Sequence, residues 1–154
     1  MTHQRQSQQK ILVEIKPKNN EFDGIFKYLQ TNSNIKDEIN ITYSSGNDNP
    51  FYLLQYDNNY YFNTNNSPNS WICFEFKNHR IIPTNYTIKS NGGDDHYHLK
   101  SWKLEGSDDK EKWFTLDSQT NNDCLKGKYR VHSFPISYEN ELHNKVQKLI
   151  KVKF

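Results

Sequence analysis

Apolar and polar residues alternate in several short segments of this chain, which is the pattern of half-buried β-strands. The clearest case is Trp71–Phe76, where Ile72, Phe74 and Phe76 fall on one face and the residues between them on the other. Three large apolar groups on one side indicate that this face is buried. Comparable patterns predict strands at 10–16, 39–45, 81–88, 98–105, 113–117, 131–136 and 148–154.

One segment has a helical rather than a strand period. Phe22, Ile25, Phe26 and Leu29 stand at i, i+3, i+4 and i+7, so their side chains share one face of a helix. We predict a short helix, or a helical turn, that covers one end of the sheet and turns this aromatic face toward the core.

Short motifs follow one another through most of the chain. They are Phe22-Asp-Gly-Ile-Phe-x-Tyr-Leu29, Ile41-Thr-Tyr-Ser-Ser45, Trp71-Ile-x-Phe-Glu-Phe76, Tyr86-Thr-Ile-x-Ser90, Leu99-Lys-Ser-Trp-x-Leu-Glu-Gly-Ser-Asp-Asp109, Trp113-x-x-Leu-Asp117, Leu125-Lys-Gly127, Phe134 and Lys148-Leu-Ile-Lys-Val-Lys153. This ordered series resembles the discoidin domain, also called the coagulation factor 5/8 type C domain, in its intracellular form. The resemblance implies an all-β fold: a jelly-roll-like antiparallel β-sandwich of the galactose-binding-like kind with short helical turns.

The resemblance also sets the expected domain boundaries. Residues 1–20 form a polar N-terminal extension, and residues 21–154 form the discoidin-type domain. The family continues past the strand that 148–154 resembles, with one more strand that closes the sheet. We therefore expect a C-terminally truncated domain that lacks its last strand, with the strand-like segment 11–15 packed on or near the edge left open.

Composition limits the possible partners and compartments. The net charge of +2 gives no general electrostatic case for nucleic acid. Lys145, Lys148, Lys151 and Lys153 lie in the last twelve residues without an acid among them. Such a run most often solvates one face of a strand, and the alternative is a weak site for an anionic surface.

Two further features of composition favour a cytoplasmic protein. The polar N-terminus has no apolar core of a secretory signal. We predict that both cysteines, Cys73 and Cys124, are free thiols in a reducing compartment.

Members of the family bind their ligands through loops at one end of the sandwich. The resemblance places these loops at 45–50, at 91–98 and at 121–124. The predicted ligand-binding residues are Asn47, Asp48, Asn49, Asp94, Asp95, His96, Tyr97 and His98. Their side chains suit hydrogen bonds to hydroxyl or peptide groups, and Tyr97 offers a stacking face. The loops lack the exposed apolar tips of membrane-inserting members, so we expect no membrane insertion.

The pair His96 and His98 follows Asp94 and Asp95, and in a strand both imidazoles would project from one face, as metal ligands need. A polar junction between loop and strand explains the same residues, and there is no cysteine or third histidine at ligand spacing. We therefore predict neither a metal nor a cofactor. Glu75, flanked by aromatic residues, is expected to have a structural role.

No nucleophile stands in a strained turn motif, so we predict no catalytic residue and no enzymatic activity. The function favoured by the sequence is non-catalytic binding of a protein partner through the loops at one end of the sandwich. The alternative is a lectin-like, carbohydrate-binding domain whose partner is a glycan.

Overall fold

The computed structural model describes residues 13–57, 59–93, 96, 98–137 and 147–154. Strands dominate it, because the alternating segments pair as the sequence predicts. The elements, in chain order, are α1 (Ile25–Asn32), α2 (Ile35–Glu38), β1 (Ile39–Tyr43), the 3-10 helix η1 (Pro50–Leu54), β2 (Trp71–Phe76), β3 (Asn85–Lys89), β4 (Trp102–Ser107), β5 (Phe114–Gln119), β6 (Val131–Pro135) and β7 (Leu149–Lys153).

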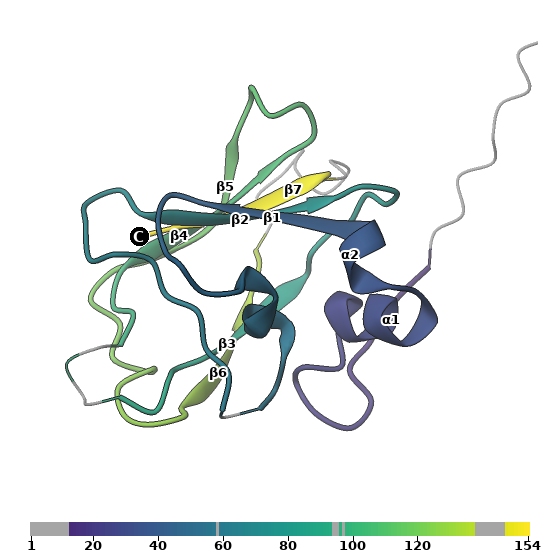
Figure 1. The fold of residues 1–154 in the computed structure, drawn as a ribbon. Helices are drawn as coiled ribbons and strands as arrows, with labels where there is room; N and C mark the ends of the chain where they lie inside the picture. The colour runs from purple at the N-terminus through teal and green to yellow at the C-terminus, as the bar shows by residue number, and fades with distance from the viewer. Residues whose placement is uncertain (1–12, 58, 94–95, 97, 138–146) are drawn as a thin grey trace, which may run out of the picture.

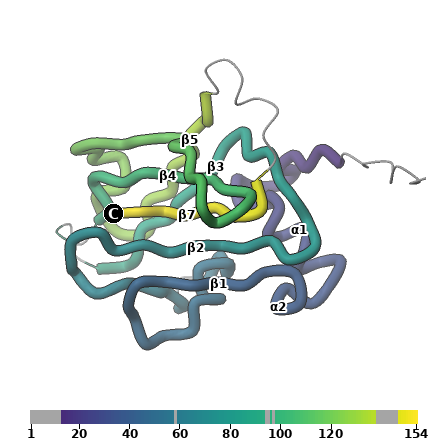
Figure 2. The backbone as a smooth tube through the Cα atoms, turned by 90° about the horizontal axis from the view of Figure 1, so that it is seen from above, coloured from purple at the N-terminus to yellow at the C-terminus, as the bar shows by residue number. Residues whose placement is uncertain are grey.

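The strands form two antiparallel sheets (Figure 1). The larger has the order β1-β2-β7-β4-β5, which can be followed in Figure 2, and the smaller pairs β3 with β6. The two sheets face each other, with α1 and η1 beside the space between them. The predicted all-β antiparallel sandwich is therefore confirmed.

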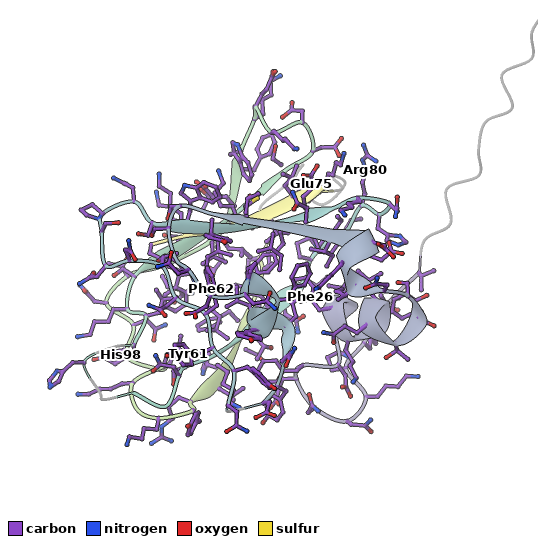
Figure 3. All side chains as sticks on the ribbon, in the orientation of Figure 1. Phe26, Tyr61, Phe62, Glu75, Arg80 and His98 are labelled. Atoms are coloured by element: carbon purple, nitrogen blue, oxygen red, sulfur yellow. The ribbon has the colours of Figure 1, made fainter. Side chains whose placement is uncertain are left out.

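The face of β2 that the sequence assigns to the core is buried. Ile72 and Phe76 point inward, and Phe26 of α1 packs against Phe74 and Phe76 with ring centroids 5.2 and 5.9 Å away (Figure 3). The predicted helix is thus confirmed as a cover over one end of the sheet. It begins at Ile25, after Gly24 as its N-cap, rather than at Phe22.

A polar link crosses the core between the two sheets. The indole Nε1–H of Trp102 in β4 donates to the hydroxyl of Tyr86 in β3 at 2.8 Å. That hydroxyl donates in turn to Oδ2 of Asp117 in β5 at 2.5 Å. Phe134 of β6 completes this part of the core, with its ring centroid 5.1 Å from that of Trp102. Directed hydrogen bonds as well as packing therefore hold the two sheets together.

Three predicted strands differ in the structure. In the N-terminal segment, residues 11 and 12 lie outside the described residues, and 13–16 form no strand, with Val13 59% exposed. The strand predicted at 10–16 is therefore wrong for residues 13–16, whereas packing of the segment on or near the sheet remains a prediction. The strand predicted from residue 98 starts at Trp102. The one predicted from residue 81 has only an isolated bridge between Ile81 and Gln147 before β3.

The C-terminal alternation is confirmed. Ile150, Val152 and Phe154 pack on the core, while Lys151 and Lys153 point to the other face. Because β7 lies between β2 and β4 and pairs with both, it is a central strand of the larger sheet.

Candidate ligand-binding end of the sandwich

Four connections gather at one end of the sandwich, because antiparallel strands begin and end there in register. The connections are 44–49 after β1, 63–70 before β2, 90–101 before β4, and 120–130 after β5. This end, which we call the loop end, lies beside the C-terminus on the left of Figures 1 and 2. The loops predicted at 45–50, 91–98 and 121–124 are thus brought to the same end.

Hydrogen bonds that involve Ser90 and the Asn91 carbonyl join two of these loops. The Ser90 hydroxyl donates to the carbonyl of Gly127 at 2.7 Å and accepts from the amide of Arg130 at 2.9 Å. The amide of Tyr129 donates to the carbonyl of Asn91 at 3.0 Å. The start of the 90–101 loop and the end of the 120–130 loop therefore act as one unit.

His98 makes a second link between the same loops. Its Nε2 lies 3.1 Å from Oδ1 of Asp123, and its side chain is only 3% exposed, against 64% for Asp123. The hydrogen bond from His98 is the main cause that lowers the pKa of the Asp123 carboxyl. His98 thus fixes the direction of a charged carboxylate that faces solvent.

Tyr129 presents an exposed ring from an unusual backbone conformation. Its φ is 55°, in the left-handed region that side chains other than glycine seldom adopt. A Cβ atom on Gly92 would overlap the phenol ring, so the glycine lets this ring lie directly on the backbone of the 90–101 loop. Tyr129 is nevertheless 43% exposed as a residue. Strained residues of this kind cluster at ligand sites, so Tyr129 is a candidate contact residue.

A lysine lies between Tyr129 and a second exposed tyrosine. The Lys89 ammonium is 4.2 Å from the ring centroid of Tyr56 and 5.6 Å from that of Tyr129. The ring of Tyr56 also packs on Phe22, at 4.7 Å between centroids, and is 56% exposed as a residue. We call Tyr56, Lys89, Gly92 and Tyr129 the tyrosine site. It combines aromatic surface with hydrogen-bond donors, which is what a polar ligand with apolar faces requires.

The ligand-binding residues predicted from the sequence lie in different environments. Asn47 and Asp48 are exposed in the 44–49 connection, whereas the Asn49 side chain accepts a hydrogen bond from the amide of Phe51 and caps η1. Asp94, Asp95 and Tyr97 lie outside the described residues. His96 is exposed.

The strand geometry considered for the two histidines is wrong, because His98 stands in a bend with its imidazole buried against Asp123. Within the described ranges, no three His, Cys, Asp or Glu side chains come together as metal ligands would.

Sequence reasoning missed Tyr56, Lys89 and Tyr129. Tyr56 and Lys89 are far apart in sequence and meet only through the fold. For Tyr129 a weak signal exists: Gly127, whose φ of 108° shapes the turn, stands two residues before it.

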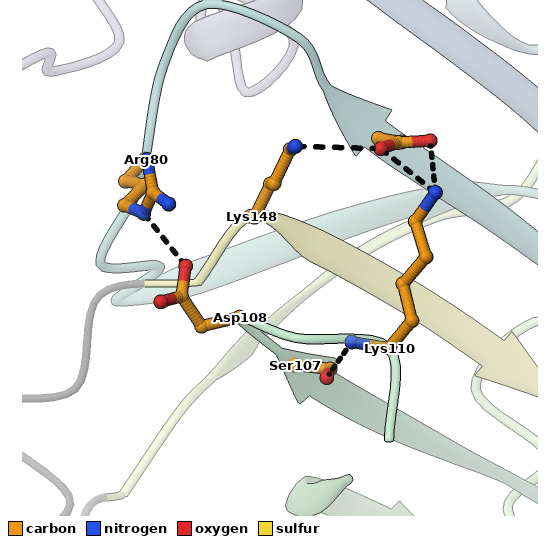
Figure 4. A network of polar contacts seen from close by, with 6 residues as sticks. Arg80, Ser107, Asp108, Lys110 and Lys148 are labelled. Carbon is orange, nitrogen blue, oxygen red and sulfur yellow. Dashed lines mark hydrogen bonds and ion pairs between the residues drawn. The ribbon is translucent and has the colours of Figure 1, made fainter. Parts of the chain in front are cut away.

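Glu75 has the structural role that we predicted. Its carboxylate lies 3.0 Å from the Lys110 ammonium and 3.7 Å from that of Lys148, both drawn in Figure 4. The hydrogen bond from Lys110 is the first cause that lowers the pKa of Glu75. Beside this pair, Arg80 binds Asp108 at 2.7 Å. These contacts join β2, β7 and the turn after β4.

Comparisons with known proteins identify solved structures that share this fold. No protein-family model matches the sequence, and no curated protein does. Solved structures do match, among them three modules of the CBM32 type from Clostridium perfringens. CpGH89CBM32-5, in complex with GalNAc-β-1,3-galactose, has a TM-score of 0.56 and 11% identity, covering 75% of this chain and 82% of its own.

The other two solved structures match a similar share of this chain. CpGH89CBM32-6 has a TM-score of 0.57 and 18% identity, covering 77% of this chain and 83% of its own. CBM32-3 from a family 31 glycoside hydrolase has a TM-score of 0.50 and 11% identity, and the match covers 76% of this chain and 78% of its own. At these identities the likeness concerns the fold: a β-sandwich of the type found in galactose-binding-like and discoidin domains. No helix in the described part of the chain is long and apolar enough to cross a membrane.

Proposed function

We propose that this protein is a non-catalytic carbohydrate-binding module that holds a glycan at the tyrosine site of its loop end. The observation that carries the proposal is Tyr129, whose exposed ring is fixed on Gly92 beside Lys89. The fold shared with three carbohydrate-binding modules supports it, one of them in complex with GalNAc-β-1,3-galactose.

The chemistry of the tyrosine site suits a saccharide. A sugar ring has an apolar face of C–H groups, which can stack on an aromatic ring, and a rim of hydroxyl groups, which need hydrogen bonds. Tyr129 and Tyr56 supply the rings. The Lys89 ammonium is a hydrogen-bond donor beside both rings.

The rigid attachment of Tyr129 matters for affinity. A ligand that binds an ordered ring need not immobilise it, so less conformational entropy is lost on binding. The left-handed backbone of Tyr129 and the hydrogen bond from its amide to the Asn91 carbonyl provide this order before the ligand binds.

The protein-interaction function favoured by the sequence remains a prediction, as does the cytoplasmic location. Exposed tyrosines are also enriched at protein interfaces, so the aromatic surface by itself fits either kind of ligand. The comparisons agree better with the saccharide, because all three neighbours are carbohydrate-binding modules.

A glycan array with the purified protein tests the proposal, followed by calorimetry with the best ligand. The array should include galactose- and GalNAc-terminated glycans. We expect Tyr129→Ala to weaken binding by roughly tenfold or more, since burying a large apolar side chain contributes about 1.5–3 kcal/mol. Tyr28→Ala is the matched control, because Tyr28 on α1 is similarly exposed, at 41%.

Two results would argue against the proposal: no glycan bound above background, or equal binding by the two variants. Capture of a protein partner that depends on the loop end, with no glycan bound, would favour the protein-interaction function instead.

A further inference from the structure

A second surface with binding chemistry lies on the outer face of the larger sheet, which points away from the smaller sheet. Ile72, Leu104 and Val152 point to the core, so their neighbours along each strand point outward. The register places Lys103 of β4 directly opposite Lys153 of β7, and Lys153 opposite Trp71 of β2. Figure 2 shows these strands side by side, seen from above the sheet.

The pairing of Lys103 with Lys153 costs stability. Like charges directly opposite on neighbouring strands repel each other, with Cβ atoms only about 4.5–5.5 Å apart. Within the described ranges, neither lysine forms an ion pair. Further along the same sheet the chain does compensate its cations, because Glu75 binds both Lys110 and Lys148. The uncompensated pair is thus a local feature that folding alone does not explain.

Lys151, two residues before Lys153, extends this positive surface. Its ammonium lies 3.5 Å from the ring centroid of Trp113 and 5.6 Å from that of Trp71. The two indoles hold the charge in place without neutralising it. Glu105 is opposite Lys151 in the register, but no ion pair joins them in the described structure. Three lysines and one acid therefore face solvent between two half-exposed tryptophans.

We propose that Lys103, Lys151 and Lys153, together with Trp71 and Trp113, form a binding surface for an anionic polysaccharide. A polymer with repeated carboxylate or sulfate groups can meet all three cations, which a single small anion cannot. Its sugar rings can pack against the tryptophan edges left exposed. The choice of a saccharide as the polymer rests on the proposed function, whereas the anion surface itself rests on the register.

Other polyanions fit less well. The net charge of the chain is only +2, and three lysines on one sheet face give a small electrostatic footprint for nucleic acid. An anionic membrane would meet the same lysines, but the flanking indoles are half-buried at the sheet and do not project as an insertion tip.

Calorimetry or affinity electrophoresis can test this surface with three probes: polygalacturonate for carboxylates, heparin for sulfates and an uncharged galactan. We expect one or both polyanions to bind at low ionic strength, and an approximately tenfold rise in salt to weaken that binding. The double variant Lys103→Gln/Lys153→Gln should weaken it by roughly two- to thirtyfold, the effect of losing two exposed ion pairs. Its thermal stability should equal or exceed that of the wild type, because the repulsion is removed.

The matched control is Lys18→Gln/Lys27→Gln, which removes the same charge from two exposed lysines elsewhere and should change binding less than the first pair does. Neutral-glycan binding at the tyrosine site should be unchanged in both double variants, so failure of this surface and failure of the proposed function are separable. Equal loss in both double variants, binding of the galactan as strong as that of the polyanions, or tighter binding of DNA or anionic vesicles would each overturn the proposal.

Discussion

The hydroxyl of Tyr86 gives the sharpest test of how the two sheets are held together. Tyr86→Phe removes one oxygen atom and leaves the ring that packs on Phe134, at 5.0 Å between centroids. The indole N–H of Trp102 then loses its acceptor, and Trp102 is only 2% exposed. Asp117 loses one donor but keeps the Gln119 amide at 2.9 Å.

The expected cost follows from these contacts. A buried donor left without a partner costs about 1–3 kcal/mol, and a hydrogen bond to a charged group contributes about 1.5–3 kcal/mol. Because Asp117 retains a partner, we expect the free energy of unfolding to fall by about 2–4 kcal/mol in total. For a chain of this size that corresponds to a drop in Tm of roughly 5–15 °C.

Chemical denaturation and thermal melting of Tyr86→Phe measure this directly. Tyr28→Phe serves as the control, since it removes an exposed hydroxyl and should change the free energy of unfolding by less than about 0.5 kcal/mol. If Tyr86→Phe loses no more than this control, the polar link between the sheets contributes nothing and the reasoning fails.

Burial, followed by the hydrogen bond to Asp117, raises the pKa of Tyr86. A tyrosine that is harder to ionise when folded adds stability that is complete below pH about 10, the ordinary pKa, and is lost as the pH rises above it. The alkaline fall in stability should therefore be smaller in Tyr86→Phe than in the wild type.

Three more outcomes are expected. Trp102→Ala should lower the free energy of unfolding by about 3–5 kcal/mol in denaturation experiments, and a loss below about 1 kcal/mol would contradict its core position. In native protein at pH about 8, Cys73 should react with a thiol reagent more slowly than Cys124, since burial raises its pKa to about 11; equal rates would be inconsistent with this. Gly92→Ala should weaken glycan binding by displacing Tyr129, whereas Gly24→Ala, with open space around its Cβ, should not.

The sequence predicts the core of this fold well because its pattern is local. The alternation in Trp71–Phe76 and in Leu149–Lys153, and the helical spacing that includes Phe26, each identify a buried face from neighbouring residues alone. The strand predicted from residue 98 begins only at Trp102. His98 instead contacts Asp123, 25 residues away, a partner that no local pattern records.

The candidate site is less predictable for the same reason. Loop positions follow from the resemblance, and the structure does bring the predicted loops to one end. The composition of the site depends instead on pairs that are distant in sequence, such as Tyr56 with Lys89 and Gly92 with Tyr129. For Asn49 the structure adds a role that the sequence analysis did not predict, because its side-chain oxygen accepts a hydrogen bond from the Phe51 amide and caps η1.

The central claim, that a glycan binds at the tyrosine site, is tested most directly by NMR titration with the best ligand from the array. The amide signals of Lys89, Gly92 and Tyr129 should move most as the saccharide is added, and those of α1 should stay in place. Saturable shifts confined to other parts of the chain, or none at concentrations where the array reports binding, would contradict the account.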